Sequence, residues 1–214
     1  MNDIGCPLCG CARVNAFFQD NTRLYYQCEQ CELVFVPPHF YLSACDEKAQ
    51  YDLHQNNDEP HYRQFLQRVY APLILRLEAG ARGLDFGCGP GPVLATMFAE
   101  RGHSMALFDP FYFPDTSVLQ QQYDFITATE VFEHLQQPRQ VIQTLWPCLR
   151  AGGTLALMTK LVLSPELFSR WHYKTDPTHI IFFSRSTFVW LAENLGAEVE
   201  FIANDVIFLR KNAA

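Results

Sequence analysis

The sequence predicts an α/β fold in which a mostly parallel sheet carries helices on both faces, preceded by a small N-terminal module. Three observations support this. From about residue 82 onward, short apolar β-like runs alternate with segments of helical period. A glycine-rich segment at 87–91 joins the first of these strands to a helix, and two Cys-x-x-Cys pairs lie within the first 31 residues. The 214 residues are 49 % hydrophobic and 18 % charged, which is typical of a globular chain.

The two cysteine pairs predict a zinc ribbon over residues 1–38. Cys6 and Cys9 form the first pair, and Cys28 and Cys31 form the second, 18 residues later. Each pair can build a tight turn that offers two thiolates to one tetrahedral ion. Metal would supply the stability that a core of ~35 residues lacks. Cys11 could replace Cys9 as a ligand. The expected ribbon strands are 14–18, 24–27 and 33–36.

Residues 39–60 are polar and irregular, and we interpret them as a linker or lid. The main domain is expected at 61–214, beginning with a helix over 61–79 that Pro72 either kinks or starts. Gly152-Gly153 should close the helix expected at 138–149, and Ser186 is the expected N-cap of the last helix. The expected strands are 82–86, 104–108, 124–129, 154–160 and an antiparallel pair at 198–203 and 206–210, and the expected helices are 93–101, 138–149 and 186–194.

The segment Gly87-Cys88-Gly89-Pro90-Gly91 follows Asp85 and precedes a predicted helix. Small residues there let a ligand approach the backbone, and a helix N-terminus favours an anionic group. Asp109 follows the next strand, where an acid can accept hydrogen bonds from both hydroxyls of a ribose. A dinucleotide site would use GxGxxG, whereas this chain has GxGxG followed by Pro92.

On these residues the chain resembles class I S-adenosylmethionine-dependent methyltransferases. The glycine segment with Asp85 matches their first motif, Asp109 their next acid, residues 123–135 their fourth-strand segment, and residues 152–158 the following strand. Together with the cysteine pairs and residues 171–179, the whole chain is similar to the zinc-ribbon branch of that superfamily. The resemblance implies a Rossmann-like sheet with S-adenosylmethionine as the cofactor.

The resemblance also implies roles for single residues. The glycines would pass the methionine part of the cofactor, and Asp85 would order their loop and, through water or directly, the cofactor's amino group. Asp109 would hold the ribose, and Glu130 and the residues around it would line the methyl side. Only 14 residues separate Asp109 from Asp124, where the family usually has a helix and a further strand. Either the aromatic residues 111–113 stack on adenine, or adenine binding is weak. The expected cofactor-binding residues are Asp85, Gly87, Cys88, Gly89, Gly91, Asp109, Pro110, Thr129 and Glu130.

Methyl transfer from a sulfonium is an in-line displacement that depends on positioning. An acceptor O–H or N–H must also lose its proton, and the candidate bases are His134, His172, His179 and Tyr173. His172 and His179 flank Asp176, but Pro177 between them weighs against a metal triad. We expect 164–183 to be a substrate-facing loop with Trp171 and Tyr173 as its walls, and 180–183 to be a core strand.

Three functions follow from this reading. The first is a methyltransferase for a small polar metabolite, such as a sugar-like molecule. The second is an RNA methyltransferase that docks through the ribbon, and the third is a non-catalytic cofactor-binding scaffold. The net charge is −7, and residues 1–60 hold nine acids against three bases, which weighs against nucleic acid as the partner. No basic start with an apolar run, and no apolar run of ~18 residues, is present. We therefore expect a cytoplasmic protein without a membrane partner.

Overall fold

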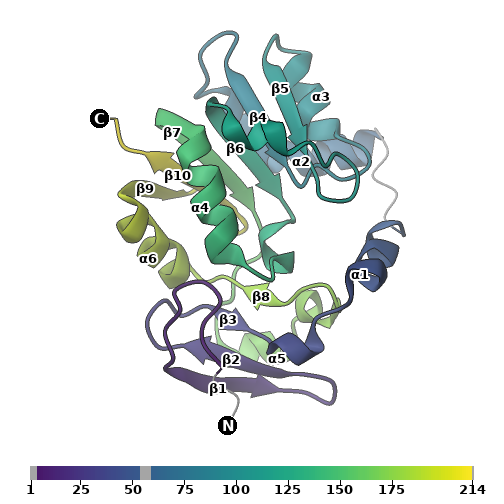
Figure 1. Cartoon of the computed structure of the whole chain (residues 1–214), viewed down its shortest axis with the longest axis vertical. Helices are drawn as coiled ribbons and strands as arrows, with labels where there is room; N and C mark the ends of the chain where they lie inside the picture. The colour runs from purple at the N-terminus through teal and green to yellow at the C-terminus, as the bar shows by residue number, and fades with distance from the viewer. Residues whose placement is uncertain (1–3, 54–58, 214) are drawn as a thin grey trace.

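The computed structural model describes residues 4–53 and 59–213, which form two sheets (Figure 1). The larger sheet has six strands in the order β5-β4-β6-β7-β10-β9, and the smaller has four in the order β1-β2-β3-β8. The large sheet lies in the upper part of Figure 1 and the small one below it. The α/β class expected from the sequence is confirmed.

The large sheet is mixed. Its first four strands in spatial order are parallel, and β10 runs antiparallel to both β7 and β9. The four parallel strands, followed in the chain by an antiparallel pair, match the pattern expected from the sequence. The strands are β4 (Arg82–Phe86), β5 (Ser104–Phe108), β6 (Tyr123–Thr129), β7 (Leu149–Met158), β9 (Ala197–Phe201) and β10 (Val206–Lys211).

Helices cover both faces of this sheet because its central strands are buried on both sides. In β7, Leu155 and Leu157 pack on one face, and Ala156 and Met158 pack on the other. The first face is covered by α4 (Pro138–Cys148) and α6 (Arg185–Leu195), the second by α2 (Pro60–Ile74) and α3 (Val93–Ala99). In Figure 1, α4 crosses the near side of the sheet.

Three expected boundaries were wrong. Pro72 does not start α2, because Pro60 occupies the first turn and Pro72 lies inside the last one. Gly152 and Gly153 lie within β7 rather than closing α4, at an irregularity in its pairing with β6. The N-cap of α6 is Ser184, which forms a reciprocal capping box with Thr187, and not Ser186.

The small sheet contains a strand from a distant part of the chain. Strands β1 (Val14–Gln19), β2 (Leu24–Cys28) and β3 (Val34–Phe35) form the expected antiparallel meander. Strand β8 (Ile181–Phe182) adds to β3 and is buried, as expected for a core strand. Helix α5 (Pro165–Ser169) supplies Phe168, whose ring packs edge-on against Tyr25 and Phe182. The N-terminal meander and the 164–183 segment therefore share one core.

The segment expected as a linker or lid contains helical structure. A short 3₁₀ turn, η1 (Pro38–Phe40), precedes α1 (Ala44–Tyr51), which Ser43 caps. Residues 54–58 of this segment lie outside the described residues. The Tyr51 ring reaches the main domain, where it packs edge-on against His134 at 5.3 Å between centroids.

Strand β5 is an edge strand, and no further strand follows it in the described part of the chain before β6. Residues 110–122 contain only a backbone bridge from Asp109 to Phe113 and the 3₁₀ helix η2 (Thr116–Gln120). This agrees with the short spacing in the sequence. Over the residues that the structure describes, no helix is both long and apolar enough to cross a bilayer.

Candidate functional site

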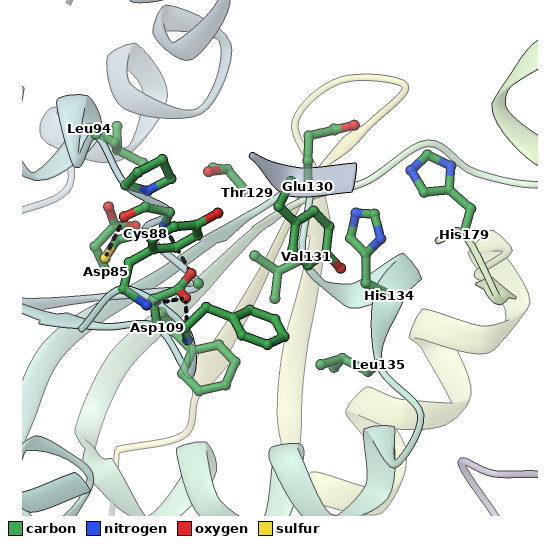
Figure 2. Close-up of a pocket in the computed structure, with 18 of the residues that line it drawn as sticks. Asp85, Cys88, Leu94, Asp109, Thr129, Glu130, Val131, His134, Leu135 and His179 are labelled. Carbon is green, nitrogen blue, oxygen red and sulfur yellow. Dashed lines mark hydrogen bonds between the residues drawn. The ribbon is translucent and has the colours of Figure 1, made fainter. Parts of the chain in front are cut away.

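A cavity of about 850 Å³ opens where β4, β5 and β6 end. Every cofactor-binding and catalytic candidate from the sequence lines this cavity. Figure 2 shows Asp85, Cys88 and Asp109 at one end, His134 and His179 at the other, and Glu130 between them. The candidates are Asp85, Gly87, Cys88, Gly89, Gly91, Asp109, Pro110, Thr129, Glu130, His134, His172, Tyr173 and His179.

The glycine loop needs its glycines for backbone conformation and for space. Gly87 has φ 72° and Gly89 has φ 63°, in the left-handed region that side chains disfavour. A Cβ on Gly87 would also lie 2.5 Å from Cγ2 of Val131. The Gly87 N–H donates to the carbonyl of Phe108 at 2.7 Å, which fastens the loop to the end of β5.

Asp109 is buried at the end of β5 and is held by backbone amides. Its Oδ2 accepts from the Gly89 N–H at 3.0 Å, and its Oδ1 accepts from the N–H groups of Phe111 and Tyr112 at 2.9 and 3.1 Å. The carboxylate therefore ties the glycine loop to the aromatic segment. Both lie on the same wall of the cavity.

Asp85 lies inside the sheet at the base of the glycine loop. Its Oδ1 accepts from the hydroxyl of Thr127 at 2.7 Å. Burial raises the pKa of Asp85 to about 7, and the negative charge of Asp109 adds to the rise. A cation bound nearby would reverse this rise.

An acidic cluster in the cavity wall is formed by Glu130, Glu133 and Tyr173. Glu130 has φ 52°, a strained conformation of the kind found at functional sites. The Tyr173 hydroxyl donates to Glu133 and lies 3.3 Å from Oε2 of Glu130. Burial raises the pKa of Glu130 to about 8, with the charge of Glu133 adding to it, and burial raises the pKa of Glu133 to about 7. Burial also raises the pKa of Tyr173 far above its usual range, so its hydroxyl stays a donor.

His134 and His179 face each other, with ring centroids 4.7 Å apart. Nδ1 of His134 lies 3.1 Å from the carbonyl oxygen of Thr178, and Nδ1 of His179 lies 2.6 Å from that of Tyr173. A carbonyl oxygen only accepts, so each Nδ1 carries the proton and each neutral ring has its lone pair on Nε2. Burial, and then the neighbouring His134, lowers the pKa of His179 to about 4.

The candidate base His172 and the expected wall residue Trp171 lie differently from these residues. His172 is exposed in η4 (His172–Thr175), where its Nε2 lies 3.2 Å from Nζ of Lys160. Trp171 is not among the cavity-lining residues; it packs behind Tyr173, at 5.0 Å between ring centroids. The expectation that Trp171 is a wall was therefore wrong, because its ring belongs to the core around Phe168.

Sequence reasoning missed Arg23, which connects the small sheet to the cavity wall. Its buried guanidinium donates to the backbone carbonyls of Lys174, Asp176 and His179, the last at 2.9 Å. Lys174 in turn forms a 3.0 Å ion pair with Asp20. An arginine before a strand carries no local signal of such contacts, which span more than 150 residues.

The four cysteines of the two pairs converge. The Sγ atoms of Cys6 and Cys31 lie 3.6 Å apart, and those of Cys9 and Cys28 lie 3.3 Å apart. All four sulfurs lie within 4.8 Å of one another. Cys11 lies outside this group, and its thiol donates to the carbonyl of Arg13.

Comparison with known proteins agrees with this geometry. Residues 61–200 match a family described as "Methyltransferase domain". No curated protein matches the sequence. An O-methyltransferase family protein from Burkholderia thailandensis has a similar fold, with 12 % identity, TM-score 0.53, and coverage of 82 % of this chain and 62 % of that one. A methyltransferase of calicheamicin biosynthesis, with S-adenosylhomocysteine bound, aligns with 12 % identity, TM-score 0.53, and coverage of 79 % and 59 %.

The family match covers well over half of the chain, and the two structures share its fold. The glycine loop and Asp109 stand at the strand ends where such a sheet binds its ligand. The chain therefore belongs to the methyltransferase-domain family and is a class I S-adenosylmethionine-dependent methyltransferase.

Proposed function

We propose that the protein transfers a methyl group to an O–H or N–H group of a small polar metabolite, such as a sugar-like molecule. The observation that carries this is the continuity of the cavity. The glycine loop and Asp109 line one end, and a cluster of carboxylates, imidazoles and a phenol lines the other. A volume of about 850 Å³ is in the range of small-molecule sites.

In this proposal residues 61–214 form the catalytic domain and residues 39–60 serve as a linker or lid. The backbone of Gly87, Gly89 and Gly91 receives the methionine part of the cofactor. Asp109 accepts the ribose hydroxyls, and the Phe111 ring stacks on adenine. Phe111 suits that task because it lines the cavity beside Asp109, whereas the Tyr112 hydroxyl is engaged with Asp52 at 2.6 Å. The methyl group then points toward Glu130.

The catalytic step needs positioning and one proton acceptor. The acceptor oxygen or nitrogen attacks the methyl carbon while the C–S bond breaks, and the electron pair stays on sulfur. Nε2 of His134 or His179 carries the lone pair that takes the proton. The Tyr173 hydroxyl serves as a hydrogen-bond donor, since its pKa is raised.

Residues 1–38 act as a zinc ribbon with Cys6, Cys9, Cys28 and Cys31 as ligands. Four thiols within 4.8 Å of one another suit a structural zinc site. Backbone N–H groups of Cys11 and Gln30 donate to the sulfurs of Cys9 and Cys28 at 3.5 and 3.4 Å, as in two tight metal-binding turns. The ribbon supports the cavity wall through Arg23.

The alternative of an RNA substrate docked on the ribbon has less support. Residues 1–38 contain two basic residues, Arg13 and Arg23. Arg23 is buried against the wall of the cavity, and exposed Arg13 pairs with Glu29 at 3.1 Å. A phosphate backbone would meet few cations on this surface.

The test uses the zinc-loaded protein and S-adenosylmethionine with a radiolabelled methyl group. We expect label to enter a small-molecule fraction of a metabolite extract and not an RNA fraction, and to be lost in Asp109→Ala. Labelling of RNA alone would contradict the proposed substrate class. A matched control is Asp115→Ala, because Asp115 is an acid of the same segment whose side chain only caps η2.

A further inference from the structure

We infer that Glu133, His134 and His179 bind a divalent transition-metal ion at the acceptor end of the cavity. One ligand atom from each lies within 4.8 Å of the other two. The three come from two segments, η3 (Phe132–His134) and the loop that follows η4. Figure 2 shows the two imidazoles side by side beyond Glu130. This site is distinct from the four cysteines.

Both histidines are oriented as metal ligands are. A ligating imidazole usually donates its second ring N–H to a carbonyl or carboxylate, which fixes the ring and its tautomer. Nδ1 of His134 donates to Thr178 and Nδ1 of His179 donates to Tyr173, both to backbone carbonyls. Each neutral ring therefore presents its lone pair on Nε2, and Nε2 of His179 lies 3.9 Å from Oδ2 of Asp176, which lines the same cavity. Nε2 of His134 lies 4.0 Å from Oε1 of Glu133.

Glu133 supplies an independent indication of a ligand. Its side chain is fully buried, and its Oε2 has no hydrogen-bond partner among the residues that the structure describes. A buried carboxylate oxygen without a partner is costly, and native proteins rarely leave one. Oε1 accepts from the Tyr173 hydroxyl and lies 4.0 Å from Nε2 of His134, so a cation between the imidazoles and this carboxylate would contact Oε1 and satisfy Oε2.

The donor set selects the class of ion. Two imidazoles and one carboxylate suit Zn²⁺, Co²⁺, Fe²⁺ or Mn²⁺. With metal–ligand bonds of about 2.1 Å, two ligand atoms on one ion are at most about 4.2 Å apart. The 4.0 Å spacing already meets that limit, and the group as a whole needs only a small contraction. Three protein ligands leave coordination positions open, as in catalytic sites.

The catalytic consequence rests on the proposed function. The bound ion would take the acceptor hydroxyl at one of its open coordination positions and would lower the pKa of that hydroxyl. With their Nε2 lone pairs on the metal ion, His134 and His179 would not accept the proton, so the hydroxyl proton passes instead to Glu130, whose carboxylate shares the Tyr173 hydroxyl with Glu133. The oxygen then forms the C–O bond as the methyl–sulfur bond breaks, leaving neutral S-adenosylhomocysteine.

The test titrates Co²⁺ into protein that holds one Zn²⁺ per chain at the cysteines, after excess zinc is removed, and follows calorimetry and the visible spectrum. We expect one Co²⁺ per chain with weak d–d bands and without the strong thiolate charge-transfer band of a cysteine site. His134→Ala and His179→Ala should each weaken this binding by at least about tenfold, the lower range of losing even an outer-shell partner. His172→Ala is the matched control, because His172 lines the same cavity outside the cluster and should leave binding unchanged.

Affinity for S-adenosylhomocysteine and thermal melting are measured on the same samples, with His134→Gln as a variant that keeps a polar side chain. Cofactor binding without a Co²⁺ site would overturn the metal inference and leave the proposed function standing. Co²⁺ binding without cofactor binding would support the metal site and contradict the proposed function. Co²⁺ binding that survives in both His134→Ala and His179→Ala would also overturn the inference.

Discussion

The Arg23 guanidinium donates a 2.9 Å hydrogen bond to the backbone carbonyl of His179, 156 residues further along the chain. Arg23 lies in the turn between β1 and β2 of the small sheet, and His179 lines the cavity. The same guanidinium also binds the carbonyls of Lys174 and Asp176. One buried side chain of the small sheet thus fixes the backbone that carries a candidate catalytic histidine.

Arg23→Ala should loosen this wall and destabilise the protein. The change leaves buried carbonyls without donors, at roughly 1–3 kcal/mol for each group that water does not reach. We expect faster amide hydrogen exchange over residues 172–180, a lower melting temperature, and affinity for S-adenosylhomocysteine within about threefold of wild type. The control is Arg13→Ala, since Arg13 is exposed in the same module. Equal exchange in both variants would show that Arg23 does not hold the wall.

Gly87→Ala should disable the cofactor loop. Gly87 has φ 72°, which an alanine disfavours, and the alanine Cβ would lie 2.5 Å from Cγ2 of Val131. We expect affinity for S-adenosylhomocysteine to fall by at least about tenfold by calorimetry, equivalent to about 1.4 kcal/mol. Gly80→Ala isolates the backbone effect, because Gly80 has φ 73° but open space around its Cβ position. Similar binding losses in both variants would argue against the steric explanation.

Asp109→Ala should weaken cofactor binding more than it weakens the fold. The variant loses three backbone hydrogen bonds that shape the cavity wall and, in our proposal, the acceptor of the ribose hydroxyls. A hydrogen bond to a charged group contributes about 1.5–3 kcal/mol, so we expect affinity to fall by at least about tenfold. Asp115→Ala should bind as wild type. Wild-type affinity in Asp109→Ala would contradict the assignment.

Local sequence signals predicted the parts of the fold that local physics decides. Strands at 82–86 and 104–108 were predicted to the residue because each is a short apolar run that glycine or an acid follows. Gly196 ends α6 in the left-handed conformation, as its position suggested. Helix α1 escaped prediction because it has no buried residue, and therefore no apolar stripe.

The site was predictable where a motif carries it and not where distant segments meet. The glycine loop and Asp109 lie together because parallel strands end at one edge of the sheet. Glu133 was not distinguished from the residues around it, because its burial follows from the 3₁₀ turn of η3 and its contact with Tyr173. The addition of β8 to β3 joins residues far apart in the chain and leaves no signal in either segment.

Removal of the proposed zinc ion should destabilise more than the N-terminal module. Because β3 pairs with β8 and Arg23 binds the 174–179 backbone, unfolding of the ribbon would release part of the cavity wall. We expect a strong chelator, or Cys9→Ser, to lower the melting temperature, by roughly 2–4 °C for each kcal/mol lost in a chain of this size. Cys11→Ser is the control, since Cys11 lies outside the thiol cluster. An unchanged melting curve after removal of one zinc per chain would contradict a structural role.

Cofactor affinity should depend on pH through Asp85. Its pKa is raised to about 7 by burial, so the side chain is mostly protonated below pH 7 in the unliganded protein. A bound amino group favours the carboxylate, and binding at lower pH must therefore expel a proton. We expect affinity for S-adenosylhomocysteine to fall by up to about tenfold per unit as pH drops below 7.

The stability of the folded protein should depend on pH in the opposite direction through the same residue, Asp85. Between about pH 4 and pH 7 the native state holds a proton on Asp85 that the unfolded state has lost, so this residue's contribution to stability falls as pH rises through that window. Asp85→Asn stays neutral and should flatten both profiles while keeping the shape of the side chain. Thermal melts and calorimetric titrations between pH 5 and pH 8 measure the two effects. If the affinity profile of Asp85→Asn kept the wild-type slope, the proton would have to come from another group, and Asp85 would have no direct electrostatic contact with the cofactor.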